Sequence, residues 1–133
     1  MAWYAVGVLR DLKMRPPVVE YLQRIDATLA PFDGHFIIHG GKAEMLEGES
    51  PGILIVIEFP DYPHAQQWYA SPAYQEIIPL RTEHSVSTTF LAEGVDRTHK
   101  ATDVLRLGKT TPPDVIKAQC VPGIAGRSPL HVW

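Results

Sequence analysis

The sequence predicts an α+β domain whose elements follow the order strand, helix, strand, strand, helix, strand. Short runs rich in Val, Ile and aromatic residues recur along residues 3–94, and a helical apolar stripe separates the first two of them. Glycine or proline stands at most of the breaks between these segments. A compact solution for such an order is an antiparallel four-stranded sheet with both helices on one face.

The first strand and the first helix lie near the N-terminus. The segment WYAVGVL, residues 3–9, predicts a buried strand. Residues 15–34 predict a helix, because apolar residues recur there at alternating spacings of four and three. These apolar residues are Val18, Leu22, Ile25, Leu29 and Phe32. Pro16 and Pro17 suit the first turn, where missing N–H groups cost little, and Gly34 suits the position just beyond the helix end.

Two further strands occupy the middle of the domain. The segment HFIIHGG, residues 35–41, predicts a strand in which Gly40 and Gly41 mark a bulge or bend. The following AEMLEG continues as strand or turn. The segment ILIVIEF, residues 53–59, is the strongest strand of the chain. Because it is apolar on both alternating faces, both of its faces should be covered.

Two helical segments and a last strand complete the pattern. Asp61 suits the N-cap of a helix over residues 62–69. The Ser71–Pro72 step ends that helix and starts a second helical segment over residues 72–78. In that segment the serine is the N-cap and the proline takes the first helical position. The segment SVSTTFLAEG predicts the fourth strand.

The pattern also predicts a homodimer. With both helices on one face, the other face of the sheet has no cover, although the strands are apolar on both alternating faces. Two such sheets facing each other across a two-fold axis would bury both exposed faces. A second subunit is therefore the expected partner.

Length, charge and cysteine content narrow the class of protein. The 133 residues suggest one domain, and an apolar fraction of 45% is enough for a core. The net charge of -3, without an evident basic face, disfavours nucleic-acid binding. The apolar run GILIVIEF is far too short to span a membrane, and the N-terminus lacks a signal-peptide pattern, so a soluble, cytoplasmic protein is expected. A lone Cys120 excludes an intrachain disulfide and any multi-cysteine metal site.

Residues 96–133 do not fit the domain predicted over residues 1–95. They show no sustained periodicity and carry scattered apolar residues among prolines and glycines. We expect a C-terminal extension, and our hypothesis is an arm that packs on the partner subunit. The terminal Trp133 is one of the apolar groups that such an arm would bury.

Four segments together resemble the DUF1330 family of the dimeric α+β barrel superfamily. They are GGKAEMLEG, IVIEFPD, QWYASPAYQEIIPLR and FLAEGV, and the resemblance covers about residues 3–105. It implies a ferredoxin-like monomer with a βαββαβ order and an antiparallel four-stranded sheet, paired into a dimeric α+β barrel. It implies no reaction, because the family is largely uncharacterised. The wider superfamily includes cofactor-free monooxygenases, isomerases, polyketide cyclases, haem-dependent enzymes and stress-response dimers.

Three residues of the stretch WYASPAYQEIIPLR are candidate site residues, and each matches the family pattern. The hydroxyls of Tyr69 and Tyr74 could donate to a substrate oxygen, or reach water while the rings pack. Arg81 could hold a carboxylate or enolate. It could equally form a structural ion pair with Glu58 or Glu83, which is the favoured interpretation. Spacing alone does not bring these three residues together, because the Ser-Pro break alters the helical register.

Two strands supply the acid–base candidates. Glu58 is a carboxylate in an apolar strand, so it is either ion-paired or raised in pKa, as a general acid or base would need. His35 and His39 are predicted on one strand face, about 13 Å apart, too far to chelate one metal alone. His39, beside two glycines, is the better acid–base candidate. The alternative for each residue is a packing or surface role.

The leading functional hypothesis is cofactor-independent acid–base chemistry on a small metabolite, of the isomerisation or cyclisation type. His39 or Glu58 would act as base, while Tyr69, Tyr74 and Arg81 stabilise developing negative charge. One alternative is a non-catalytic ligand-binding or interaction dimer, and another is a haem- or oxygen-dependent enzyme. The histidines show no metal-binding spacing and no nucleotide motif occurs, so neither a cofactor nor a metal site is predicted.

Overall fold

The computed structural model describes residues 1–105 of the chain. Its elements are β1 (Trp3–Arg10), α1 (Pro16–Leu29), the short 3₁₀ helix η1 (Ala30–Phe32), β2 (His35–His39), β3 (Ile53–Phe59), α2 (Tyr62–Ala70), α3 (Pro72–Thr82) and β4 (Val86–Glu93). The strands pair antiparallel in the order β2-β3-β1-β4. The predicted α+β architecture with a four-stranded antiparallel sheet is confirmed.

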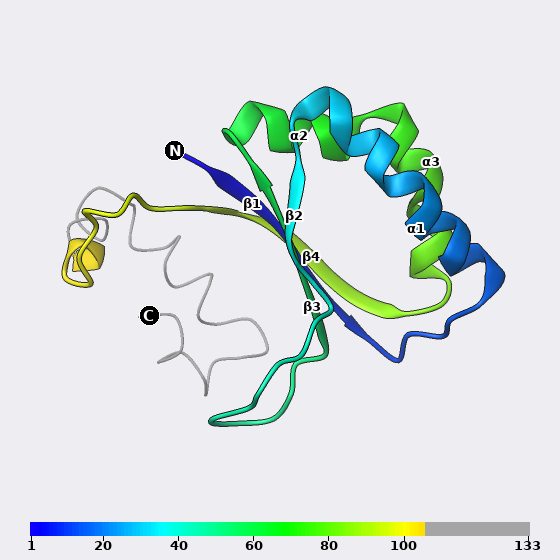
Figure 1. The fold of residues 1–133 in the computed structure, drawn as a ribbon, viewed down its shortest axis with the longest axis horizontal. Helices are drawn as coiled ribbons and strands as arrows, with labels where there is room; N and C mark the ends of the chain where they lie inside the picture. Colours follow the sequence, from blue (N-terminus) through cyan, green and yellow to red (C-terminus); the bar gives the residue numbers. More distant parts are fainter. Residues whose placement is uncertain (106–133) are drawn as a thin grey trace. The chain divides into compact units, whose positions relative to one another are not determined.

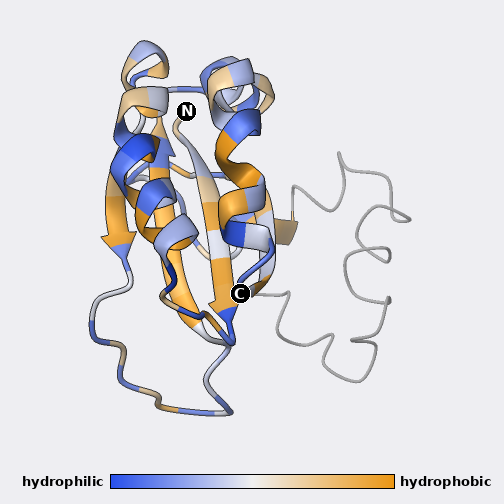
Figure 2. Cartoon of the chain, turned by 90° about the vertical axis from the view of Figure 1, so that its right-hand side faces the viewer, coloured by the Kyte–Doolittle hydropathy of each residue, from blue (hydrophilic) through white to orange (hydrophobic). Residues whose placement is uncertain are grey.

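The helices of the first compact unit, residues 1–95, all lie on one side of the sheet (Figure 1). Helix α2 packs on β1, β3 and β4, whereas α1 and α3 pack mainly against each other. Figure 2 shows the apolar strands behind these helices. The helical layer is therefore closed onto the sheet near α2 and looser beneath α1 and α3.

The core is formed by buried side chains of α1, α2, α3 and β3. Phe59 and Ile77 are its largest fully buried side chains, and the Phe59 ring packs at 5.4 Å from that of Trp68. Trp68 is buried and donates its indole N–H to the Thr28 hydroxyl at 3.0 Å. That hydroxyl donates in turn to the Ile25 carbonyl at 2.6 Å, so the buried polar atoms of this group satisfy one another.

Helix α1 forms where predicted, and Val18, Ile25 and Leu29 of its predicted stripe are buried, but Tyr21 is buried in place of Leu22. Tyr21 is buried with 7% of its surface exposed, whereas Leu22 is 38% exposed. The helix end also differs, because Asp33, with φ 56°, takes the left-handed position. Gly34 is needed for space instead: a Cβ there would lie 2.7 Å from the Phe59 ring.

The predicted helix starts after β3 are confirmed. The Asp61 carboxylate accepts a hydrogen bond from the His64 N–H, and the Ser71 hydroxyl accepts one from the Tyr74 N–H. Ser71 also donates to the Trp68 carbonyl at 2.7 Å, which ties the end of α2 to the start of α3. Helix α3 continues past the predicted end at residue 78, through Pro79, to Thr82.

Strand β2 contains a β-bulge between Phe36 and Ile38, whereas the sequence predicted a bulge or bend at Gly40 and Gly41. Phe36 pairs with Ile57 and Ile38 pairs with Val56, so β2 has one residue more than β3 between these pairs. The extra residue reverses the alternation of faces. His35 and His39 therefore lie on opposite faces of the sheet, and the prediction that they share one face was wrong.

The segment after β2 is a bend and a loop. Gly40 has φ 69°, which suits the predicted bend, and no strand forms between β2 and β3. Of the two alternatives for AEMLEG, strand or turn, the strand is therefore wrong.

The sheet face opposite the helices carries apolar side chains that unit 1–95 leaves uncovered. Phe90 is 49% exposed, and Ile38 and Val86 are similarly exposed. The second compact unit, residues 96–133, is described only as far as residue 105. The hypothesis of a C-terminal arm falls on residues outside the described part. In that described part, no helix combines the length and apolarity needed to cross a bilayer.

Candidate functional site

A cavity of about 760 Å³ lies between the sheet and the helical layer. Its walls are mostly apolar and include Val18 and Ile25 of α1 and Ile55 of β3. Polar groups enter from a few positions, of which Tyr21, Tyr74, Arg81, Tyr69 and His39 matter most. A volume of this size with apolar walls and few polar groups is typical of small-molecule sites.

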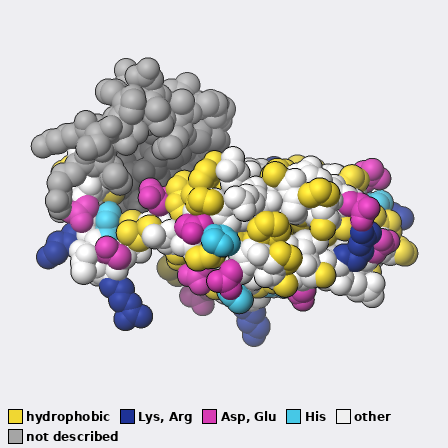
Figure 3. All heavy atoms as spheres, turned by 90° about the horizontal axis from the view of Figure 1, so that it is seen from above, with side chains coloured by type: hydrophobic (Ala, Val, Ile, Leu, Met, Phe, Trp, Pro, Cys, Tyr) yellow, Lys and Arg dark blue, Asp and Glu magenta, His cyan; other side chains and the backbone are white. Residues whose placement is uncertain are grey.

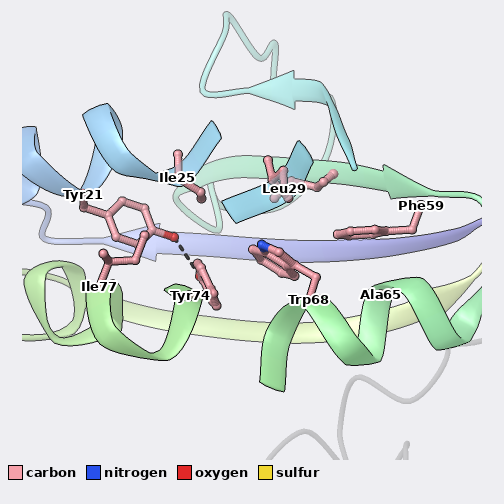
Figure 4. Close-up of a cluster of buried hydrophobic side chains, with 9 residues drawn as sticks. Tyr21, Ile25, Leu29, Phe59, Ala65, Trp68, Tyr74 and Ile77 are labelled. Carbon is pink, nitrogen blue, oxygen red and sulfur yellow. Dashed lines mark hydrogen bonds between the residues drawn. The ribbon is translucent and has the colours of Figure 1, made fainter. Parts of the chain in front are cut away.

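Two buried tyrosines meet across the helical layer. The hydroxyls of Tyr21 on α1 and Tyr74 on α3 lie 2.7 Å apart and form a hydrogen bond (Figure 4). Burial raises the pKa of Tyr21, so this phenol stays protonated. Two hydroxyls carry two protons, and one hydrogen bond uses only one of them. The other hydroxyl proton stays available to an acceptor in the cavity.

Arg81 is the buried charge of the site, with 4% of its surface exposed. Its Nη1 donates to the Ser87 hydroxyl at 2.6 Å, and its Cζ lies 5.5 Å from the centre of the Tyr21 ring. No ion pair joins Arg81 to a carboxylate within residues 1–105. The favoured interpretation, an ion pair with Glu58 or Glu83, was therefore wrong.

The continuous helix α3 explains why Tyr74 and Arg81 line the same cavity. They are seven residues apart, which is two helical turns, so both face the cavity. The Ser71 cap fixes where this helix begins. Tyr21 was missed by the sequence reasoning, although it stands three residues after Val18 and four before Ile25, which is the same helical spacing.

The other two predicted residues that line the cavity are less enclosed. Tyr69 is 41% exposed, and its ring centre lies 5.7 Å from that of Tyr74. His39 is exposed, and its ring stacks on Phe36 with centres 4.2 Å apart. Both are positioned to contact a molecule that enters the cavity.

Glu58 does not join these residues. It pairs in register with Tyr4 and His35 on the sheet face opposite the helices. The Tyr4 hydroxyl donates to its carboxylate at 3.4 Å. The structure therefore brings together Tyr69, Tyr74, Arg81 and His39 around one cavity and leaves Glu58 on the other side of the sheet.

The described residues support neither a metal site nor a basic patch of the kind that binds nucleic acid. Within residues 1–105, no group of three His, Cys, Asp or Glu side chains could hold a metal ion. On the face that Figure 3 shows, basic side chains lie apart from one another, with acidic side chains beside several of them.

Comparison with known proteins defines the family and the fold. The sequence model described as "Domain of unknown function (DUF1330)" matches residues 2–95. A protein of unknown function from Rhodopseudomonas palustris is 16% identical, with a TM-score of 0.55 over 71% of this chain and 83% of that one. A dimeric ferredoxin-like protein of unknown function from a Jannaschia species is 12% identical, with a TM-score of 0.56 over 71% of this chain and all of that one (100%). These likenesses show the ferredoxin-like fold of the chain.

A more distant likeness is to a cofactor-independent oxygenase from Streptomyces nogalater. It is 15% identical, with a TM-score of 0.43 over 74% of this chain and 96% of that one. This similarity is too weak to support a transfer of function. No curated protein matches the chain.

Proposed function

We propose that this chain, which belongs to the DUF1330 family, binds a small and largely apolar molecule that carries a carboxylate or an enolate. The molecule would occupy the cavity between helices and sheet. The observation that carries the proposal is Arg81, a buried cation that lines an apolar cavity and has no carboxylate partner within residues 1–105.

Energetics favour an anionic occupant. A guanidinium stays charged in proteins, and burying an uncompensated charge costs several kcal/mol. The Ser87 hydroxyl and the Tyr21 ring offset part of this cost but bring no negative charge. A ligand oxyanion would supply it. It could accept from the remaining guanidinium N–H groups and from the unused proton of the Tyr21–Tyr74 pair.

The test compares matched acids and amides. Calorimetric titration with naphthoate should show binding, and naphthamide, which has the same shape without the charge, should bind at least about tenfold more weakly. Replacing Arg81→Met should remove the difference between the two probes. Arg24→Met is the matched control, because Arg24 is on the surface and pairs with Glu20 and Glu76. Equal binding of acid and amide by the unaltered protein would refute an anion site.

A second candidate function is acid–base catalysis of the isomerisation or cyclisation type. The same guanidinium and tyrosine donors would stabilise an enolate oxygen, which is the role of an oxyanion hole. His39 is the predicted base that lines the cavity, and it would take the proton from the carbon next to the carbonyl.

Proton exchange separates catalysis from binding. In D₂O, an aryl ketone bound to the protein should lose its α-proton NMR signal faster than the free ketone. Tyr74→Phe should slow this exchange, because it removes a hydroxyl that can donate to the oxyanion. Binding without any acceleration of exchange would leave the chain a binding protein.

We also propose a homodimer formed through the sheet face opposite the helices. The support is the exposure of Phe90, Ile38 and Val86 on that face, and the similar protein from Jannaschia is described as dimeric. Phe90→Glu should convert the dimer to a monomer in light scattering. Val19→Glu, on an exposed position of α1, is the control and should leave the dimer intact. A monomeric unaltered protein would refute the proposal.

A further inference from the structure

The floor of the cavity is a row of four residues that crosses the whole sheet. His39 pairs with Ile55, Ile55 with Gly7, and Gly7 with Thr89, so the row runs from edge strand β2 to edge strand β4. All four residues line the cavity. Three strand spacings separate the ends of the row, a distance of about 14 Å between backbones.

Gly7 is the one residue of this row without a side chain. It lies in a central strand, where glycine weakens a sheet and offers no side chain to pack. Neither its backbone nor its neighbours require glycine. Its φ is not positive, and a Cβ built there would lie 3.7 Å from Thr89 and 3.9 Å from Ile55, which are ordinary contacts. Glycine in such a place points to close approach by a ligand.

The two ends of the row differ in chemistry. At the β4 end, Ser87 lies next to this row on the same face, and it accepts the hydrogen bond from Arg81. At the β2 end, the His39 ring stacks on Phe36 and lines the cavity. An imidazole carries one N–H when neutral and two when protonated, so it can donate a hydrogen bond to an oxygen in either form.

We infer that the ligand is an elongated amphipathic acid that lies across the strands over Gly7. Its carboxylate binds at Arg81, its unbranched or flat apolar body crosses the glycine, and a polar oxygen at its far end meets His39. This inference rests on the proposed anion site but adds the length, the direction and the second polar end of the ligand.

The first test fills the floor. Gly7→Val should weaken binding of decanoate by at least about tenfold, because the new side chain would occupy the space of the apolar body. Binding of benzoate, which reaches only the Arg81 end, should stay within a factor of about two. Gly41→Ala is the control, since a Cβ at Gly41 meets nothing within 4 Å. Circular dichroism should confirm that each variant is folded.

The outcomes separate this inference from the proposed function. Benzoate binding that survives while decanoate binding is lost supports the inference. If Gly7→Val left decanoate binding unchanged, or weakened both acids equally, the position across the glycine would be wrong although the anion site stood. If the unaltered protein bound neither acid, both the anion site and the inference would fall. Gly7→Ala, a smaller change, should give an intermediate loss for decanoate and guards against misfolding of the valine variant.

The second test addresses the far end of the ligand. The probe is the analogue of decanoate with a terminal hydroxyl. The His39→Phe variant should bind it about tenfold more weakly than the unaltered protein does, because one hydrogen bond is lost. Phenylalanine keeps the stacking surface against Phe36 and removes the N–H. His35→Phe makes the same substitution on the opposite face of the same strand and should change nothing. Equal effects of the two substitutions would overturn the role of His39.

Discussion

Replacing Arg81 with methionine should leave the protein about as stable as before, while anion binding is lost. The substitution removes a guanidinium with 4% surface exposure and puts an apolar chain of similar length in its place. If Arg81 is present to bind a ligand, the empty protein bears the cost of its burial and gains little from it. Stability and binding should therefore change independently.

The contributions can be estimated from the contacts. Methionine loses the hydrogen bond from Nη1 to Ser87, worth about 2 kcal/mol for a charged donor, and the contact with the Tyr21 ring, worth about 1 kcal/mol. It also relieves the burial of a charge, which costs about 3 kcal/mol. The expected net change in the free energy of unfolding is within about 1 kcal/mol of zero. For a unit of this size, 1 kcal/mol corresponds to a shift of about 4–8 °C in Tm.

Urea unfolding at fixed protein concentration is the suitable assay, because a dimer makes apparent stability concentration-dependent. The m-values of the two proteins must agree before the free energies are compared. Arg24→Met is again the control for loss of a surface arginine. A loss of about 3 kcal/mol or more, the cost of breaking a buried charge network, would show that Arg81 is structural and would refute the reasoning.

Three further predictions concern the tyrosine pair, the packing at Gly34 and the cap of α2. Tyr21→Phe and Tyr74→Phe should each destabilise the protein, and the double variant should cost about 1 kcal/mol less than their sum, because the two hydroxyls share one hydrogen bond; additive effects in urea unfolding would contradict this. Gly34→Ala should cost about 1–3 kcal/mol by thermal unfolding, because the new Cβ would lie 2.7 Å from the Phe59 ring, and an unchanged Tm would argue against that contact. Hydrogen bonds from the His64 side chain and backbone lower the pKa of Asp61 in the folded protein. The unfolded chain therefore binds the proton more readily, so Asp61 stabilises the fold above its unfolded pKa and this contribution disappears as the pH falls through the folded pKa. Asp61→Asn should flatten the loss of stability below about pH 4 in urea unfolding, and an unaltered acid profile would contradict the assignment.

The elements could be predicted because their signals are local. The strong apolar run of β3 matches its predicted bounds, and the N-caps at Asp61 and Ser71 each depend on a side chain and a backbone N–H three residues later. Such signals need no knowledge of the partner elements.

The faces of the two ends of β2 and one buried position of α1 could not be predicted, because packing against distant elements decides them. In β2, one bulged residue between Phe36 and Ile38 sends His39 to the helix face, and the glycines that suggested a bulge lie after the strand. In α1, the predicted stripe did not count tyrosine as apolar, so it placed Leu22 rather than Tyr21 on the buried face. Tyr21 is buried because its hydroxyl finds that of Tyr74, 53 positions away in the sequence.

The positions of the two predicted bases, His39 and Glu58, favour anion binding over acid–base catalysis as the function of the cavity. Arg81 binds at the β4 end of the cavity, through Ser87, and His39 lies on β2. The backbones of these two edge strands are about 14 Å apart by strand spacing. A base must reach the proton it removes to within hydrogen-bonding distance. His39 can therefore act as base only for a ligand carbon that lies within reach of its imidazole while the oxyanion is held by Arg81. Glu58, the other predicted base, is on the far face of the sheet. Anion binding requires only Arg81 and the tyrosine pair, whereas catalysis also requires a ligand carbon within reach of His39, so anion binding ranks before catalysis.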